Sequence, residues 1–243
     1  MCSVRSTLQK GFTLVELVVV IIILSVLGIM TSNYIGMGVD IYSDIVERDR
    51  ALNSVRFVME RLRREVTNAL PNSAAVTADG LCLTFTPIVA GSIYSDFPIS
   101  PATGSTGIIS PISDYSVVSG DKAVVYLLAA DELTDSNKVR AISSINDSKD
   151  MLSFATESSF PLSSPAKRVY IVRDNLRYCF IDSELKRQRN SDPFVLMAEN
   201  ITGSFSVSDA TLQGYALVQA VFNLNFDGQE VPVVQTLHIN NVP

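Results

Sequence analysis

The 243-residue sequence predicts an α+β fold in which a long N-terminal helix packs on a C-terminal antiparallel β-sheet domain. A long apolar run opens the chain and continues into an amphipathic pattern of helical period. After Pro71 the pattern changes to short apolar runs separated by turn residues, which is typical of strands and hairpins. Because a sheet needs one covered face and the helix offers an apolar stripe, the simplest arrangement packs the sheet on the helix.

The apolar run is long enough to cross a membrane once. Residues 17–39 carry no charged side chain, and about 20 residues at ~1.5 Å each span a hydrocarbon core of ~30 Å. Arg5 and Lys10 precede this span, and the first charges after it are Asp40 and Asp44. Because the positively charged flank of a span stays in the cytoplasm, the bulk of the chain is expected on the other side.

The helix is expected to continue from residue 40 to residue 70, where Pro71 ends it. Apolar residues recur there at spacings of seven, three and four, and charged residues occupy the other faces. The apolar positions are Ile45, Leu52, Val55, Met59, Leu62, Val66 and Ala69/Leu70.

The remaining chain is expected to form antiparallel strands. One hairpin is predicted around Asp174-Asn175, and a stronger one around Asp227-Gly228, because Asp-Gly accepts positive φ angles. Residues 87–119, rich in Gly, Pro, Ser and Thr, are expected to form a long loop. The expected strands cover residues 81–86, 122–128, 151–155, 168–173, 176–181, 215–226 and 229–239.

The most specific motif is Lys10-Gly11-Phe12-Thr13-Leu14-Val15-Glu16-Leu17, which follows a basic leader. Glu16 stands alone in the apolar run, and a charge near a bilayer core costs about 2.5–3.5 kcal/mol on insertion scales, so it requires a partner. An ordinary signal peptide or a simple membrane anchor does not explain Glu16, and no small-residue cleavage site follows the apolar run. The segment resembles the N-terminus of type IV prepilins and type II secretion pseudopilins.

This resemblance implies processing and assembly. Prepilin peptidase would cut between Gly11 and Phe12, removing residues 1–11, and Phe12 would be N-methylated. Glu16 would neutralise the N-terminal amine of a neighbouring subunit. The partners implied are other major and minor pilins, the inner-membrane assembly platform and, before assembly, membrane lipid.

The resemblance also implies a location for each segment. Residues 12–39 would form the transmembrane and assembly segment, and residues 40–70 the periplasmic half of the helix. Residues 71–243 would form a β-rich globular domain. The chain would be a single-pass protein of the bacterial inner membrane with its C-terminal domain in the periplasm, or at the pilus tip on the cell surface.

Segments beyond the N-terminus resemble minor pilin-like proteins of the mannose-sensitive haemagglutinin (MSHA) pilus system, which would prime or cap the filament. Two functions stay open beside this one: a J-type pseudopilin of a type II secretion system, and a membrane-anchored enzyme or receptor. Arg61, Arg63 and Arg64 are interpreted either as a solvated helix face or as contacts to acidic neighbouring subunits. The segments that carry the resemblance are residues 61–73, 82–83, 85–88 and 238–243.

Two cysteines remain once Cys2 leaves with the leader. Cys82 and Cys179 form an even pair in a chain expected to face an oxidising compartment, and both lie in strand-like contexts. They are interpreted as a disulfide or as two buried free thiols. Closing a loop of about 97 residues would contribute roughly 4–5 kcal/mol in the chain-entropy model.

Charge and motifs exclude several functions. The formal net charge is −6, and it becomes −8 once the leader removes two of the 19 basic residues and none of the 25 acidic ones. An acidic exterior argues against nucleic acid as a partner. No catalytic constellation, cofactor motif or metal motif is present, so the chain is not expected to be an enzyme.

Two weaker candidates favour ordinary structural roles. His238 is flanked by apolar residues and is interpreted as a strand histidine. The acidic clusters at residues 131–135 and 146–150 lack the spacing of a calcium loop, and they are interpreted as solvated turns rather than as a metal site.

Overall fold

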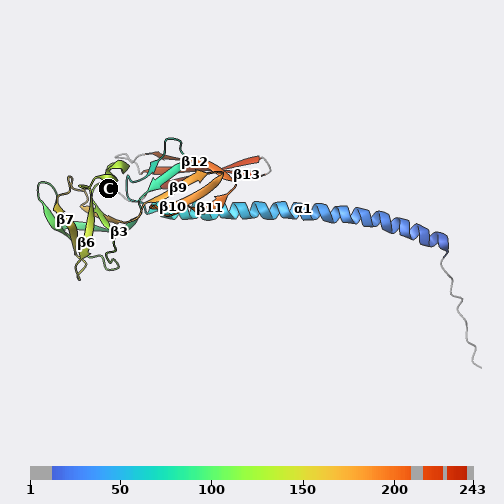
Figure 1. Ribbon diagram of the computed structural model, residues 1–243, viewed down its shortest axis with the longest axis horizontal. Helices are drawn as coiled ribbons and strands as arrows, with labels where there is room; N and C mark the ends of the chain where they lie inside the picture. Colours follow the sequence, from blue (N-terminus) through green and yellow to red (C-terminus); the bar gives the residue numbers. More distant parts are fainter. Residues whose placement is uncertain (1–12, 209–215, 227–228, 240–243) are drawn as a thin grey trace, which may run out of the picture. The chain divides into compact units, whose positions relative to one another are not determined.

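The computed structural model describes residues 13–208, 216–226 and 229–239 (Figure 1). The chain divides into two compact units, residues 1–50 and residues 51–243. One long helix is followed by antiparallel strands, and this expected order is confirmed.

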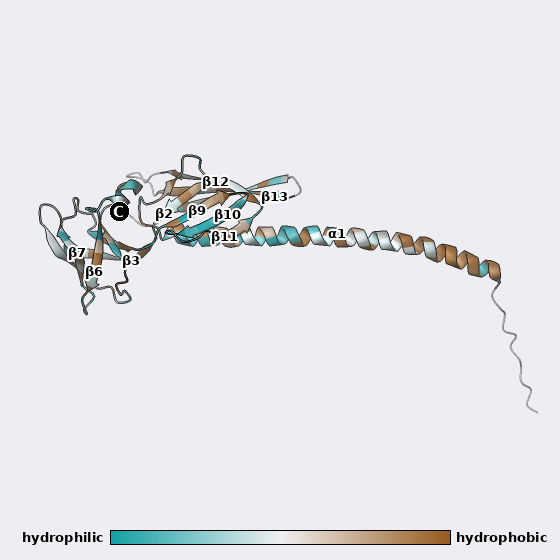
Figure 2. Cartoon of the chain, viewed as in Figure 1, coloured by the Kyte–Doolittle hydropathy of each residue, from teal (hydrophilic) through white to brown (hydrophobic). Residues whose placement is uncertain are grey.

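Helix α1 runs from Leu14 to Thr67, 54 residues. By length and composition it is the one helix of the described residues that is able to cross a membrane, and Figure 2 shows its N-terminal half as predominantly apolar. The helix ends three residues earlier than expected. Leu70 N–H donates to the Thr86 carbonyl, and Ala69 forms a β-bridge with Pro87. Strand-like pairing with this later segment therefore ends the helix before Pro71 does.

Two sheets share the core that covers the end of α1. The first contains five strands in the order β1-β2-β9-β10-β11, and the second contains three in the order β12-β13-β14, all pairing antiparallel. The strands are β1 (Ala75–Val76), β2 (Cys82–Phe85), β9 (Leu176–Ile181), β10 (Glu184–Arg189), β11 (Val195–Glu199), β12 (Ile201–Ser208), β13 (Leu217–Phe226) and β14 (Gln229–His238).

The apolar stripe of α1 packs against both sheets. Val55, Leu62 and Val66 are buried together with strand residues such as Phe85, Leu185 and Phe222. The stripe also includes Val58, which the spacing analysis did not select, whereas Ile45 is exposed. The two sheets approach closely at Gly203, where a Cβ atom would lie 2.6 Å from the Phe180 ring.

Of the two predicted hairpins, one is confirmed and one is wrong. β13 and β14 pair over their full length, and their turn, Asp227-Gly228, lies outside the described residues. Around Asp174-Asn175, by contrast, the two flanking strands belong to different sheets. β9 instead turns into β10 through Asp182 and Ser183, both at positive φ. That turn was missed because it contains no glycine.

The prediction of a long loop over residues 87–119 is wrong. The segment contributes two strands of a closed six-stranded barrel, in the order β3-β4-β7-β6-β5-β8. Its glycines permit close packing, since a Cβ at Gly107 would lie 2.3 Å from the Phe97 ring. The barrel strands are β3 (Ile88–Asp96), β4 (Gly104–Ile109), β5 (Lys122–Val124), β6 (Val139–Ile145), β7 (Met151–Ser158) and β8 (Arg168–Val172), with the 3₁₀ helix η1 (Ala130–Thr134) between β5 and β6.

The barrel has its own core, separate from the helix–sheet core. Tyr94, Phe97, Phe154 and Phe160 pack inside it as an aromatic cluster. The whole barrel is inserted in the sequence between β2 and β9, which are neighbours in the five-stranded sheet.

Arg140 is buried in the barrel without a carboxylate among its hydrogen-bond partners in the described residues. Its guanidinium carbon lies 4.2 Å from the Phe154 ring centroid, and its nitrogens donate to the carbonyls of Gly104, Thr156 and Ser158. The β4–β7 register shifts between Gly104 and Thr106, close to these carbonyls. Burial lowers the pKa of Arg140, and its hydrogen bonds to backbone carbonyls offset part of the cost of burying the guanidinium.

Asp121 anchors the loop that precedes β5. Its fully buried carboxylate accepts hydrogen bonds from Arg173 Nε at 2.6 Å, Tyr115 Oη at 2.7 Å and Val118 N–H at 2.8 Å. Burial alone would raise the pKa of Asp121, but these donors outweigh it and hold the pKa below its ordinary value.

We expect Asp121→Asn to lower the free energy of unfolding by about 2 kcal/mol at neutral pH, because it leaves Arg173 and the loop donors without a charged acceptor. Since the folded-state pKa is depressed, the stabilisation is present above about pH 4 and is lost as the pH falls through the folded pKa. Urea unfolding of the full chain between pH 2.5 and 7 measures this. Asp114→Asn, at an exposed position, is the control. If the free energy of unfolding fell equally steeply with decreasing pH in wild type and in Asp121→Asn, the acid-sensitive stabilisation would not come from Asp121.

Candidate functional site

The two residues of the predicted cleavage junction, Gly11 and Phe12, lie outside the described residues. Glu16 is exposed in the first turn of α1, and its backbone N–H donates to Thr13 Oγ1 at 3.3 Å. Thr13 to Glu16 thus has the T-x-x-E spacing of a helix capping box. A carboxylate in the first turn also interacts favourably with the helix dipole. Sequence reasoning missed this local role, which the spacing alone would have revealed.

The apolar half of α1 offers a continuous surface for lipid or for other helices. Its large side chains from Leu14 to Val39 are exposed, and residues of several helix faces contribute. A surface of this size requires cover, because soluble monomers rarely expose apolar patches above a few hundred Å². The N-terminal half of the helix therefore has the surface of a membrane-anchored or helix-packed segment.

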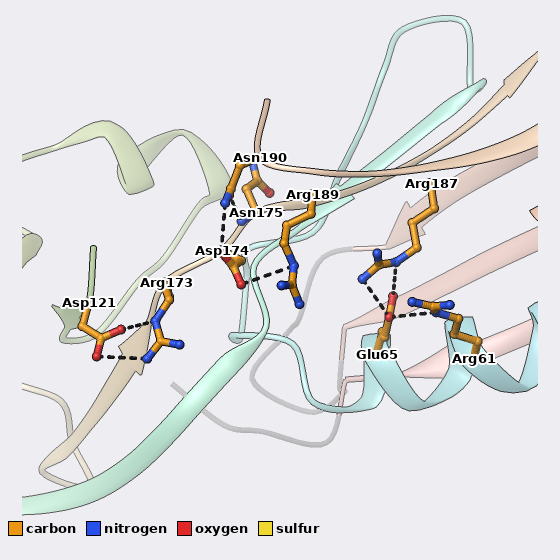
Figure 3. A network of polar contacts seen from close by, with 9 residues as sticks. All are labelled: Arg61, Glu65, Asp121, Arg173, Asp174, Asn175, Arg187, Arg189 and Asn190. Atoms are coloured by element: carbon orange, nitrogen blue, oxygen red, sulfur yellow. Dashed lines mark hydrogen bonds and ion pairs between the residues drawn. The ribbon is translucent and has the colours of Figure 1, made fainter. Parts of the chain in front are cut away.

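Glu65 is the polar contact that fixes the end of α1 to the five-stranded sheet (Figure 3). Its carboxylate accepts hydrogen bonds from Tyr178 Oη of β9 at 2.6 Å and from Arg187 of β10 at 3.0 and 3.2 Å. Arg61, one turn earlier on the helix, adds a contact of 3.2 Å. One carboxylate thereby joins a helix and two strands.

The contact shifts the pKa values of the two donors that face Glu65. Burial and then the hydrogen bond to Glu65 raise the pKa of Tyr178, so its hydroxyl remains a donor. Burial lowers the pKa of Arg187, but the Glu65 contacts outweigh it and raise that pKa. Tyr178 and Arg187 therefore both stay protonated at neutral pH and remain hydrogen-bond donors to the Glu65 side chain.

The three helix arginines that the sequence analysis selected, Arg61, Arg63 and Arg64, have intramolecular partners. Arg61 bonds Glu65, whereas Arg63 and Arg64 contact Glu60 at 3.1 and 3.5 Å on an exposed face. The latter pairs fit the solvated-face interpretation. Arg61 belongs to the helix–sheet contact instead, which the sequence analysis missed because it treated Glu65 as one more residue of the polar face.

Cys82 and Cys179 lie directly opposite each other on β2 and β9. Their sulfurs are bonded at 2.09 Å, with the Cα atoms 4.1 Å apart. The disulfide therefore joins the two strands that lead into and out of the inserted barrel.

The weaker candidates have structural surroundings. His238 is exposed on β14, opposite Leu217. In the acidic clusters, Glu132 pairs with Lys138, and the Asn146 side chain bonds Asp150 at 2.6 Å. Across residues 13–208, 216–226 and 229–239, no three metal-ligating side chains come together.

Residues 7–32 match the prokaryotic N-terminal methylation motif. The match includes residues 7–11 of the predicted leader, the predicted Gly11–Phe12 junction, Glu16 and the first part of α1. The chain matches no curated protein and no solved structure. A prepilin-type motif of this kind implies a type IV pilin-like or pseudopilin protein, and it implies processing by prepilin peptidase and assembly with other pilins.

We expect Glu65→Gln to destabilise the domain by about 2 kcal/mol, because it leaves the largely buried Arg187 without its charged partner. Glu60→Gln is the matched control: it removes ion pairs on the exposed face of the same helix, and we expect a loss below about 0.5 kcal/mol. Urea unfolding of the full chain in detergent micelles compares the two. Equal effects would show that Glu65 is no more than a surface residue.

Proposed function

We propose that this chain is a minor pilin-like structural protein of a type IV pilus of the MSHA type, which primes or caps the filament. The observation that carries the proposal is the order of features at the N-terminus: a basic leader, the Gly11–Phe12 junction, Glu16 and an apolar helix. The MSHA assignment is supported by the resemblance of residues 61–73, 82–83, 85–88 and 238–243 to minor pilin-like proteins of that system.

The precursor is a single-pass inner-membrane protein with residues 12–39 in the bilayer. The helix continues from residue 40 to its end at Thr67 in the periplasm, where residues 71–243 fold as the β-rich domain. Prepilin peptidase hydrolyses the Gly11–Phe12 bond and releases residues 1–11, and the new amine of Phe12 is then methylated. The apolar surface of α1 supports this proposal, because it suits lipid before assembly and other helices afterwards.

Glu16 has two separable tasks in this proposal. Locally, its position three residues after Thr13 supports the first turn of the helix. In the assembly, its carboxylate pairs with the N-terminal amine of a neighbouring subunit. Such a pair lowers the cost of holding either charge in apolar surroundings and fixes the register of the two helices.

A J-type pseudopilin of a type II secretion system is the second candidate. The matched N-terminal motif is common to pilins and pseudopilins, and it supports both. Both proposals assign the protein a structural role, in which the β-rich domain is carried into an assembly by the N-terminal helix. They differ in the machine that receives it.

Replacing Gly11 with Asn is expected to block cleavage, because the proposed scissile bond follows this residue directly. Intact-mass measurement of the membrane-extracted chain distinguishes the precursor from a product that lacks residues 1–11. The wild-type chain in the same cells is the control. A product of mature mass from the Gly11→Asn chain would contradict the assigned junction.

Glu16→Gln is expected to reduce recovery in sheared filaments at least ten-fold, since it removes the charge but keeps a side chain that suits the capping position. Thr13→Ala, which removes the capping hydroxyl and leaves the charge, is the matched control and should assemble normally. Immunoblots of filament and membrane fractions provide the measurement. Normal incorporation of Glu16→Gln would refute the charge-pairing role.

A further inference from the structure

The two ends of the inserted barrel meet within the fold. β3, its first strand, and β8, its last, are neighbours in the closed barrel, and Ile88 lies directly opposite Val172. Ile88 lies six positions after Cys82, and Cys179 lies seven positions after Val172. Once the barrel is folded, the two cysteines are therefore joined by an effective loop of about 13 residues instead of 97.

Both connections between the barrel and the sheet are held by specific contacts. At the connection from β2, Leu70 N–H donates to the Thr86 carbonyl and Ile88 N–H donates to the Asn68 carbonyl. At the connection to β9, the neighbouring residues Arg173 and Asp174 bind in different directions (Figure 3). Arg173 pairs with Asp121 of the barrel, and Asp174 forms an ion pair with Arg189 of the sheet.

We propose that the barrel acts as a folding checkpoint for the disulfide: its folding brings Cys82 and Cys179 together, so that the disulfide forms on chains with a complete barrel. Loop-closure probability falls with loop length to the power of about 3/2. An effective loop of 13 rather than 97 residues accelerates closure by about 20-fold. The bond then holds β2 beside β9 at the base of the barrel.

The covalent step needs an external disulfide as oxidant. The thiolate of one cysteine attacks that disulfide, forming a mixed disulfide and releasing one thiolate of the oxidant. The thiolate of the second cysteine then attacks the protein sulfur of the mixed disulfide and releases the other thiol. Two protein thiols are oxidised and one oxidant disulfide is reduced to two thiols. The barrel accelerates the second, intramolecular attack.

The test uses the reduced full chain with Cys2→Ser, in detergent micelles, with oxidised glutathione as the oxidant. Acid quenching and mass spectrometry give the rate at which the mixed disulfide converts to the protein disulfide, at a series of urea concentrations. Amide hydrogen exchange at the same concentrations reports separately on the barrel strands and on β12–β14. We expect the closure rate to fall by about 20-fold at the urea concentration where the barrel loses protection.

Two phenylalanines provide matched variants, because both are fully buried, one in each core. Phe160 lies in the barrel core and Phe222 in the helix–sheet core. Phe160→Ala should move the loss of barrel protection and the fall in closure rate to the same lower urea concentration. Phe222→Ala should leave the closure rate unchanged. Leu152→Ala, also in the barrel core, replaces Phe160→Ala should that variant fail to fold.

Two outcomes would overturn the checkpoint. In the first, the closure rate follows the protection of β12–β14 and falls in Phe222→Ala, so that the sheet core brings the cysteines together. In the second, a barrel variant loses barrel protection while the closure rate is unchanged.

Discussion

The packing of the end of α1 against the sheets is the constraint on which the rest of the domain depends. Val55, Leu62 and Val66 supply the apolar contact, and Glu65 adds a polar contact to two strands of the five-stranded sheet. Burial of these aliphatic side chains provides most of the free energy that holds the helix against the sheets, at about 1.5–3 kcal/mol for each side chain. The Glu65 contacts add geometric specificity. The bidentate bonds from Arg187 and the hydroxyl bond from Tyr178 can form together in only one orientation of the helix. The helix that begins within the N-terminal methylation motif is thus also part of the domain core.

The second constraint is topological. A closed barrel with its own aromatic core is inserted in the sequence between two adjacent strands of the five-stranded sheet, β2 and β9. The sheet stays continuous because the first and last strands of the barrel are neighbours, so that the chain enters and leaves the barrel at nearby points. When the barrel is folded, the effective loop that the disulfide closes is consequently much shorter than the sequence separation of 97 residues. In the chain-entropy model, the disulfide stabilises the fold by roughly 4–5 kcal/mol when the barrel is unfolded in the reference chain. The stabilisation is smaller when the barrel is already formed in the reference chain.

Local patterns predicted the helix and the β13–β14 hairpin, because a repeat of helical period and an Asp-Gly turn are both short-range signals. They failed where tertiary contacts override composition. Residues 87–119 resemble a loop, yet Gly107 is required by the Phe97 ring that lies against it. Asp174-Asn175 resembles a hairpin turn, yet it joins two sheets. At the site, the motif around Glu16 lies in one short segment, so the sequence alone predicts it. The partners of Glu65 lie 113 and 122 residues away in the sequence, and no spacing rule indicates them.

We propose that this chain takes part in building a type IV pilus. A deletion strain, scored in parallel for surface pili and for secreted enzymes and complemented with wild-type or Glu16→Ala chains, tests it most directly. We expect loss of pili with normal secretion, restored by the wild-type chain and not by Glu16→Ala. Normal pili with blocked secretion would contradict it in favour of a pseudopilin, and no change in either would contradict a role in assembly altogether.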